Sequence, residues 1–287
     1  MEFKKEELIK SPLNYTGGKF KLLPQLLPLF PDKIDTFVDL FGGGFNVGIN
    51  VNCNDIIYND ILTYLVDMFK EMNENSNKIL DKIKQLIKVY DLNKENTNGF
   101  LKLRKNYNKT KNSIELYVLA SYSFNYQLRF NNSLNYNSSF GRNRSSFNTN
   151  MEKRLIKFLK IMDNKNITFH NQDFSFVKNI NLDENDLVYV DCPYLISQAS
   201  YNDGKRGFGD WKEENERDLL ATLDHLNKNN VKFALSNVLE HKGNTNEILL
   251  EWSAQYNVHF LEKDYNNCSY HGKNINKETI EVLITNY

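Results

Sequence analysis

The stretch Thr36-Phe-Val-Asp-Leu-Phe-Gly-Gly-Gly44 predicts a buried strand that ends in three consecutive glycines. A short apolar run bounded by turn residues is typical of a parallel strand covered on both faces. Glycines directly after such a strand let a ligand approach bare backbone at the carboxyl edge of the sheet. The stretch by itself therefore indicates either a ligand site at this strand end or a tight turn.

The spacing of the glycines narrows the class of ligand. A dinucleotide fingerprint requires G-x-G-x-x-G, but Val47 occupies the third glycine position and Gly48 comes one residue late. A phosphate-binding P-loop requires Gly-Lys-Ser/Thr, and Gly18-Lys19 is followed by Phe20. The pattern favours a nucleoside-like ligand without a pyrophosphate clamp.

Further apolar runs alternate with longer helical patterns along the chain. We expect strands at 36–41, 55–58, 167–170, 186–190, 231–235, 260–264 and 279–285, and helices at 61–92, 113–128, 151–162 and 213–227. The Asn/Ser-rich stretch up to Asn150 is expected to be loop or hairpin. This order predicts a doubly wound α/β sheet, interrupted between its second and third strands by an insert of about 90 residues.

Composition excludes several classes of protein. The 287 residues carry 36 Lys+Arg and 36 Asp+Glu, and no run approaches the roughly 18 apolar residues of a membrane helix. The start, MEFKKEELIK, is too polar for a secretory signal. Cys53, Cys192 and Cys268 include no C-x-x-C pair, which argues against a disulfide framework or a zinc site. We expect a cytoplasmic protein that needs no metal.

The neutral total hides a strong charge asymmetry. Residues 101–160 hold twelve Lys/Arg and two acids, a net charge of +10, and the other 227 residues carry −10. Between Ser121 and Arg144 the bases are interleaved with aromatic and amide side chains. Arg and Lys suit phosphates, Asn and Gln suit base edges, and aromatic rings suit stacking. This pattern favours a nucleic-acid contact over the alternative, a merely solvated basic helix face.

A second motif, Asp191-Cys-Pro-Tyr194, directly follows the apolar strand Leu187-Val-Tyr-Val190. It is compatible with a simple turn, but it places a carboxylate at the ligand edge of the sheet. The Asp191 carboxylate and a neighbouring backbone carbonyl could accept both N–H bonds of an exocyclic amine. The amine lone pair would then point at an electrophile, while Tyr194 stacks on a base that has left the helix.

Two further features fit the same site. Asn14-Tyr-Thr-Gly-Gly-Lys19 combines an aromatic residue, two glycines and a lysine, which indicates either a lid over a ligand or an exposed turn. Asp60 ends the second strand, 18 residues after Gly42, where a carboxylate can accept hydrogen bonds from ribose hydroxyls.

Together the three motifs resemble the Dam-type DNA adenine-N6 methyltransferases, in order and spacing and over nearly the whole chain. The resemblance implies a Rossmann-like seven-stranded sheet and S-adenosylmethionine as cofactor. It further implies a catalytic domain of residues 1–72 and 163–287, and a mainly helical target-recognition domain, 73–162, that carries a hairpin. The partner would be double-stranded DNA, and the protein would be a monomer whose function is paired with a restriction endonuclease or serves epigenetic marking.

The resemblance also assigns roles to individual residues. The catalytic residues would be Asp191, Pro193 and Tyr194. The cofactor would be held by Tyr15, Gly18, Lys19, Asp39, Phe41, Gly42, Gly43, Asp60, Asp173 and Asp191. DNA would be contacted by Asn14, Phe124, Asn125, Gln127, Arg129, Asn131, Arg142 and Arg144. Within that last set, Phe124-Asn125 resembles the pair that wedges into the duplex, and Arg129 resembles the arginine that reads guanine.

Two departures from the family pattern bear on function. D-P-P-Y has become D-C-P-Y, and we interpret Cys192 as a packing residue because the backbone carbonyl survives the change and no neighbour activates the thiol. The resemblance implies GATC or a related short sequence as the target. Asn14 stands where enzymes of this family that modify GATC commonly have lysine, and since asparagine pairs more naturally with adenine, this departure argues against GATC itself.

Several rival functions remain to be separated by observation. An RNA adenine methyltransferase would use the same chemistry, although RNA helices hide the groove that Arg129 would read. A DNA-binding regulator on an inactive fold would be expected to lack Asp191 or Gly42, and both are present. A protein glutamine methyltransferase would favour Asn at position 191, and the displaced Gly48 disfavours a nicotinamide oxidoreductase.

Overall fold

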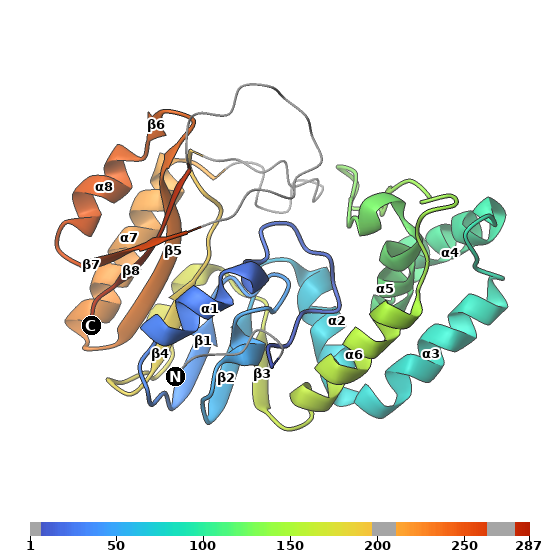
Figure 1. Cartoon of the computed structure of the whole chain (residues 1–287), viewed down its shortest axis with the longest axis horizontal. Helices are drawn as coiled ribbons and strands as arrows, with labels where there is room; N and C mark the ends of the chain where they lie inside the picture. The colour runs from blue at the N-terminus through green and yellow to red at the C-terminus, as the bar shows by residue number, and fades with distance from the viewer. Residues whose placement is uncertain (1–6, 197–210, 263–278) are drawn as a thin grey trace.

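A central mixed sheet organises the computed structural model, which describes residues 7–196, 211–262 and 279–287 (Figure 1). The strands follow the order β3-β2-β1-β4-β5-β8-β7, and a short eighth strand, β6, pairs with β5. Their bounds are β1 (Thr36–Asp39), β2 (Asp55–Asn59), β3 (Asn166–His170), β4 (Leu187–Val190), β5 (Lys232–His241), β6 (Asn244–Thr245), β7 (Asn257–Leu261) and β8 (Ile280–Thr285). Strands β1 to β5 run parallel, and β8 is antiparallel to both β5 and β7.

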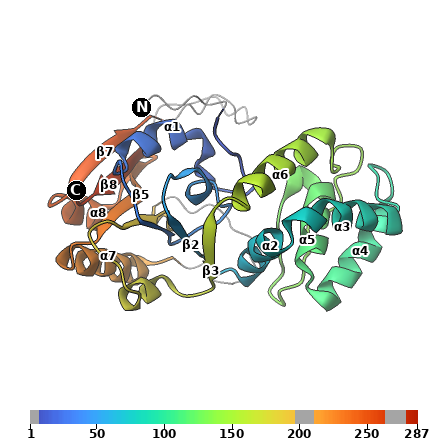
Figure 2. The same ribbon diagram turned by 90° about the horizontal axis from the view of Figure 1, so that it is seen from below.

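Helices cover both faces of this sheet, as the doubly wound pattern predicts (Figure 2). One face packs on α1 (Leu23–Leu26) and its flanking 3₁₀ turns η1 (Lys19–Lys21) and η2 (Leu27–Leu29). The other face packs on α7 (Glu213–Lys228) and α8 (Glu247–Ser253). Successive residues of β1 point to opposite faces, so Phe37 contacts the α1 layer and Val38 contacts the α7 layer.

The sheet has a topological switch point between β1 and β4. From β1 the chain continues outward to β2 and β3, whereas from β4 it continues to β5 on the opposite side. Asp39 is paired with Tyr189, so the two strands end almost level. The carboxyl ends of such neighbouring strands form the crevice in which α/β proteins bind ligands. The glycine loop that begins at Gly42 and the turn at Asp191 therefore meet at this crevice.

The insert between β2 and β3 is helical, as expected (Figure 1). It contains α3 (Ser76–Val89), α4 (Thr97–Thr110), α5 (Ser113–Tyr122), η4 (Phe124–Tyr126) and α6 (Thr149–Met162), and α2 (Thr63–Glu74) connects it to the sheet. Its apolar core is continuous with that of the sheet edge. Phe45, which follows the glycine loop, packs edge-on against Tyr58 of β2 at 4.8 Å, Phe69 of α2 at 5.6 Å and Phe158 of α6 at 6.1 Å between ring centroids.

The expected hairpin lies between α5 and α6. Two antiparallel bridges define it, Ser123 with Phe140 and Phe130 with Tyr136. At its tip the Asn131 Oδ1 atom accepts the backbone N–H groups of Ser133 at 3.0 Å and Asn135 at 2.9 Å. An asparagine that caps its own turn in this way stabilises a tight reversal of the chain.

Several expected boundaries were wrong. The helix predicted at 61–92 is two helices that break at Asn75, and the helix predicted at 113–128 ends at Tyr122. The strand predicted at 260–264 overlaps β7, which spans Asn257–Leu261, and residues 263–264 of that prediction lie outside the described residues. A helical period alone does not locate such breaks, since it continues across a reorientation of the chain.

Four of the α-helices and strands were not anticipated at all: α4, α1, α8 and the short strand β6. The first of these contains Gly99, which lowers helix propensity. The tertiary structure requires this glycine, because a Cβ there would lie 2.2 Å from the Tyr90 carbonyl oxygen. Within the described ranges, no helix has the length and apolar character that crossing a membrane demands.

Candidate functional site

The centre of the crevice is a buried ion pair between Lys19 and Asp191. Lys19 comes from η1 in the amino-terminal segment, and Asp191 directly follows β4. The Lys19 Nζ atom lies 2.5 Å from Asp191 Oδ1, and the lysine side chain is only 5% exposed. The carboxylate that pairs with Lys19 is thus supplied by the chain itself.

Glu281 is a third member of this cluster, and the sequence analysis missed it. It lies on β8, is 1% exposed, and places Oε1 3.8 Å from Lys19 Nζ. The Tyr194 hydroxyl donates to Asp191 Oδ1 at 3.1 Å and lies 3.4 Å from Glu281 Oε1. A single charged residue inside the apolar strand Ile-Glu-Val-Leu-Ile was the available signal, because an unpaired carboxylate is costly inside a sheet.

The cluster orients the Asp191 carboxylate. Burial raises the pKa of Asp191, while the positive charge of Lys19 opposes that rise. Oδ1 is engaged by Lys19 and Tyr194, and no hydrogen bond from the described residues reaches Oδ2. Lys19 Nζ also lies 5.1 Å from the centre of the Tyr194 ring, which holds that ring in place. One carboxylate oxygen is thus anchored and the other can accept a hydrogen bond from a ligand.

Cys192 belongs to a separate buried cluster behind this site. Its thiol is 3% exposed and lies 3.7 Å from Asn237 Nδ2 on β5. The same amide donates to Glu216 Oε1 at 3.1 Å, and Trp211 Nε1 donates to Glu216 Oε2 at 2.7 Å. Burial raises the pKa of Cys192 well above its usual range, so this thiol is a poor nucleophile. The neighbouring Pro193 is also buried.

The glycine loop forms a tight cradle beside the cluster. A Cβ on Gly42 would lie 2.3 Å from the Tyr58 ring, and Gly43 has φ +48°. Tyr15 packs over the loop, since a Cβ on Gly43 would lie 3.1 Å from its ring. Gly18 donates its backbone N–H to the Tyr15 carbonyl at 3.4 Å, which joins the amino-terminal motif into one turn.

Two buried carboxylates flank this loop. Asp39 accepts the Gly48 N–H at 3.0 Å, and burial raises its pKa to about 8. Asp60 accepts the N–H groups of Gly43 at 2.9 Å and Leu62 at 2.8 Å, and burial raises its pKa to about 6. Neither carboxylate has a cationic partner within 4 Å among the described residues. Acidic groups held in this way are suited to hydroxyl or ammonium donors of a ligand.

Three aromatic rings pack together beside the end of β1. The rings of Phe41 and Phe174 stack with centroids 5.8 Å apart, and Trp211 meets Phe41 edge-on at 6.0 Å. Phe41 was an expected site residue, whereas Phe174 and Trp211 were not singled out. Asp173 is exposed and caps the turn η5 (Phe174–Asn179) by accepting the Ser175 N–H at 3.0 Å.

The expected DNA-contacting residues gather on the hairpin side of the insert. Asn14 Nδ2 donates to the Asn125 carbonyl at 3.2 Å. The amino-terminal motif therefore touches residues 124–129, the loop expected to recognise DNA (the recognition loop). Phe124 is 41% exposed, and the Arg144 guanidinium lies 5.0 Å from its ring centre. Asn125 adopts φ 54°, a left-handed conformation that asparagine tolerates better than most residues.

The remaining expected contacts are also at the surface. Arg129 and Arg142 are exposed, and neither forms an ion pair with a described residue. The Gln127 carbonyl accepts hydroxyl groups of Tyr136 at 3.0 Å and Ser138 at 2.8 Å, which ties this loop to the hairpin. Asn131 differs from the other expected contacts because its Oδ1 atom already accepts hydrogen bonds within the hairpin turn.

The burial of Asp39 predicts a pH-dependent stability. Below about pH 4 both folded and unfolded chains hold the Asp39 proton, and above that the unfolded chain releases it while the fold, with its pKa of about 8, retains it. Stability from this group is therefore lost as pH rises from about 4 to 8. Asp39→Asn keeps an acceptor for Gly48 but does not titrate, so its stability relative to wild type should increase with pH, by as much as about 5 kcal/mol across this range.

Urea unfolding of both proteins at pH 5 and pH 8 measures that difference, with other titrating groups common to the two. A stability difference that stays constant between these pH values would contradict a neutral, buried Asp39.

Comparison with known proteins agrees with this architecture. Residues 15–267 match the family of D12 class N6 adenine-specific DNA methyltransferases. The chain is 54% identical to the type II methyltransferase M.FokI of Planomicrobium okeanokoites and 49% identical to modification methylase StsI of Streptococcus sanguinis. These matches cover 99% and 98% of this chain but only 44% and 43% of the relatives. A DNA adenine methylase of Haemophilus influenzae is 24% identical over 66% of this chain and 65% of its own length. This chain therefore belongs to the D12 class of N6 adenine-specific DNA methyltransferases.

Proposed function

We propose that this chain transfers a methyl group from S-adenosylmethionine to N6 of adenine within a short sequence of double-stranded DNA. The observation that carries the proposal is the Asp191 carboxylate, anchored through one oxygen by Lys19 and Tyr194 at the switch point of the sheet. The family assignment and the +10 insert support it. The chain spans less than half the length of M.FokI and StsI, so its activity is proposed for this segment alone.

The residues around the glycine loop fit S-adenosylmethionine. The bare backbone at Gly42 and Gly43 leaves room for a ligand, and Asp39 and Asp60 are buried acceptors without cations. In our assignment Asp60 takes the ribose hydroxyls, Asp39 faces the ammonium group, and Phe41 with Phe174 bounds the adenine. When bound, the cofactor supplies an electrophilic methyl group.

The residues of the D-C-P-Y turn would prepare the target amine. The free Oδ2 of Asp191 and a neighbouring backbone carbonyl accept the two N–H bonds, which keeps the nitrogen lone pair out of conjugation with the ring. The Tyr194 ring, held by its hydroxyl bonds, stacks on the flipped base. Transfer is direct, and no covalent enzyme intermediate is needed, because the exocyclic nitrogen itself forms the new bond to the methyl carbon. The buried Cys192 thiol is not available as a nucleophile.

The basic insert would bind and read the duplex. Exposed bases such as Lys102, Lys105 and Arg142 contact phosphates, and Arg129 reads a guanine edge. Phe124 enters the base stack from its exposed position over Arg144. Because the relatives include a type II methyltransferase and a modification methylase, we further propose that the chain acts beside a restriction endonuclease.

The direct test of the activity is a labelling experiment. The protein is incubated with duplex DNA and cofactor radiolabelled in the methyl group, and the DNA is then digested to nucleosides. Label in N6-methyladenine supports the proposal, and label absent from that nucleoside refutes it. Structured RNA in a parallel reaction separates the RNA alternative, and sequencing of methylated DNA identifies the target site.

Asp191→Asn should lower the rate of methyl transfer by about 10³-fold, because the neutral amide cannot orient the amine as the carboxylate does. Glu184→Gln, an exposed change that precedes the same strand, is the matched control and should leave the rate within twofold. Single-turnover methylation of a cognate duplex measures both. Retained turnover in Asp191→Asn would remove this residue from its assigned role.

Glu281 is proposed as a positioning residue, since it acts through Lys19 and Tyr194. Glu281→Gln should lower kcat by about tenfold while leaving KM for DNA within about twofold, because the DNA-contacting residues are elsewhere. A lowered Tm with unchanged kcat would instead show that Glu281 serves only the fold.

Arg129→Ala should relax selectivity at one base pair, costing about 1–3 kcal/mol of discrimination. Lys105→Ala is the comparison variant, and it should weaken binding to all sequences equally and make the salt dependence shallower by about one unit of slope. Binding to the cognate site and to single-base variants at several salt concentrations measures both effects. Equal losses of Arg129→Ala on cognate and noncognate DNA would contradict the reading role.

A further inference from the structure

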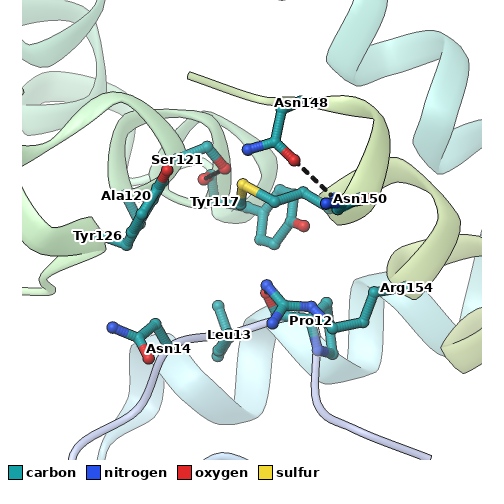
Figure 3. A pocket seen from close by; sticks show the side chains of 11 residues that line it. Pro12, Leu13, Asn14, Tyr117, Ala120, Ser121, Tyr126, Asn148, Asn150 and Arg154 are labelled. Atoms are coloured by element: carbon teal, nitrogen blue, oxygen red, sulfur yellow. Dashed lines mark hydrogen bonds between the residues drawn. The ribbon is translucent and has the colours of Figure 1, made fainter. Parts of the chain in front are cut away.

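A second cavity, separate from the Asp191 site, lies between the amino-terminal segment and the insert. Its volume is about 410 Å³, which is within the range of small-ligand sites. Pro12, Leu13 and Asn14 form one wall, and residues of α5, η4 and α6 form the rest (Figure 3). None of Lys19, Asp191, Tyr194 and Glu281 lines it.

Two residues that line this cavity each carry a buried polar atom without a hydrogen-bond partner. These atoms are the Tyr117 hydroxyl and the Arg154 Nε atom, and no other buried side-chain nitrogen or oxygen of the described residues is left unpaired. Tyr117 is 1% exposed, so its hydroxyl has lost water without gaining a protein partner. Such groups are rare in folded proteins, because a buried donor that has lost water without gaining a partner destabilises the fold.

The surrounding contacts fix these two groups without satisfying them. Arg154 donates from Nη2 to the Pro12 carbonyl at 3.2 Å, which holds the guanidinium against the opposite wall. The Asn148 side chain is engaged in capping α6 through the Met151 N–H at 3.1 Å. Figure 3 shows Tyr117 and Arg154 facing the space enclosed by these walls. Two hydrogen-bond donors, one of them cationic, are thus held ready for an acceptor oxygen.

The remaining lining indicates what carries that oxygen. Leu13, Ala120 and Met151 supply apolar contact, and Tyr126 supplies an aromatic ring. A flat base with carbonyl groups, attached to a phosphate, combines these properties. The cavity also adjoins the recognition loop, because Tyr126 follows Phe124 and Asn125, and Asn14 bonds to the Asn125 carbonyl at 3.2 Å.

We propose that this cavity holds one nucleotide of the bound DNA, other than the target adenine, displaced from the stack next to the recognition loop. A base carbonyl or phosphate oxygen of that nucleotide accepts hydrogen bonds from the Tyr117 hydroxyl and Arg154 Nε. Displacing a nucleotide costs unstacking energy, and filling two unsatisfied donors offsets part of it. This inference rests on the proposed DNA substrate.

Tyr117→Phe tests the inference, because it removes only an atom that makes no hydrogen bond in the fold. We expect this variant to melt at the wild-type temperature or above, yet to bind cognate duplex about fivefold to tenfold more weakly. Tyr122→Phe is the matched control on the same helix. Its hydroxyl donates to the Leu92 carbonyl at 3.3 Å, so its loss should lower Tm without changing DNA affinity.

Two series of duplexes locate the nucleotide and its acceptor. One series carries a single abasic site at each position in turn, and the other a single methylphosphonate. We expect one position in one series to weaken wild-type binding and to cause no further loss in Tyr117→Phe, and the series identifies base or phosphate as the acceptor.

Two results would overturn the assignment of the cavity. One is that Tyr117→Phe binds the unmodified duplex as tightly as the wild type does. The other is that the loss of affinity caused by Tyr117→Phe adds to the loss caused by the modification in every duplex of both series. Failure of the wild-type protein to bind any duplex would instead overturn the proposed function. The two failures are therefore distinguishable.

Discussion

The buried ion pair between Lys19 and Asp191 joins parts of the chain that are 172 residues apart. A carboxylate at the switch point of the sheet loses much of its hydration, and a lysine from the amino-terminal segment restores a favourable environment for its charge. Glu281 and Tyr194 complete the cluster from β8 and from the turn after β4. Because every member is held by another, the Asp191 oxygen that faces a ligand has a defined direction, which is the preorganisation that transfer chemistry requires.

The apolar core connects the sheet to the helices of the insert. Phe45 follows the glycine loop and packs against α2 and α6, so the helices of the insert rest on the same apolar core as the glycine-loop edge of the sheet. The charge distribution acts over a longer range. Residues 101–160 carry +10 and the rest of the chain −10, so under the proposed function the basic segment would attract DNA and the rest would repel it, which would orient the duplex before any base is read.

Local sequence was sufficient for the parts of the fold that depend on local patterns. The strand-glycine motif at 36–44, the strand before Asp191 and the basic insert were all identified correctly, because apolar period and charge are local properties. The predicted ends of helices were less accurate, as the break at Asn75 shows, and the helix α4 was not predicted. In α4 the tertiary contact at Gly99 overrides a poor helix propensity.

The sequence by itself determined the class of fold, the family resemblance and the residue types that carry the proposed chemistry. Only the tertiary structure brought Glu281 to Lys19, packed Phe174 and Trp211 around Phe41, and left the Tyr117 hydroxyl without a partner. The physical reason is that these are pairwise and long-range relations. Whether a buried polar atom has a hydrogen-bond partner depends on which residues pack against it. The period, spacing and composition of a sequence do not contain that information.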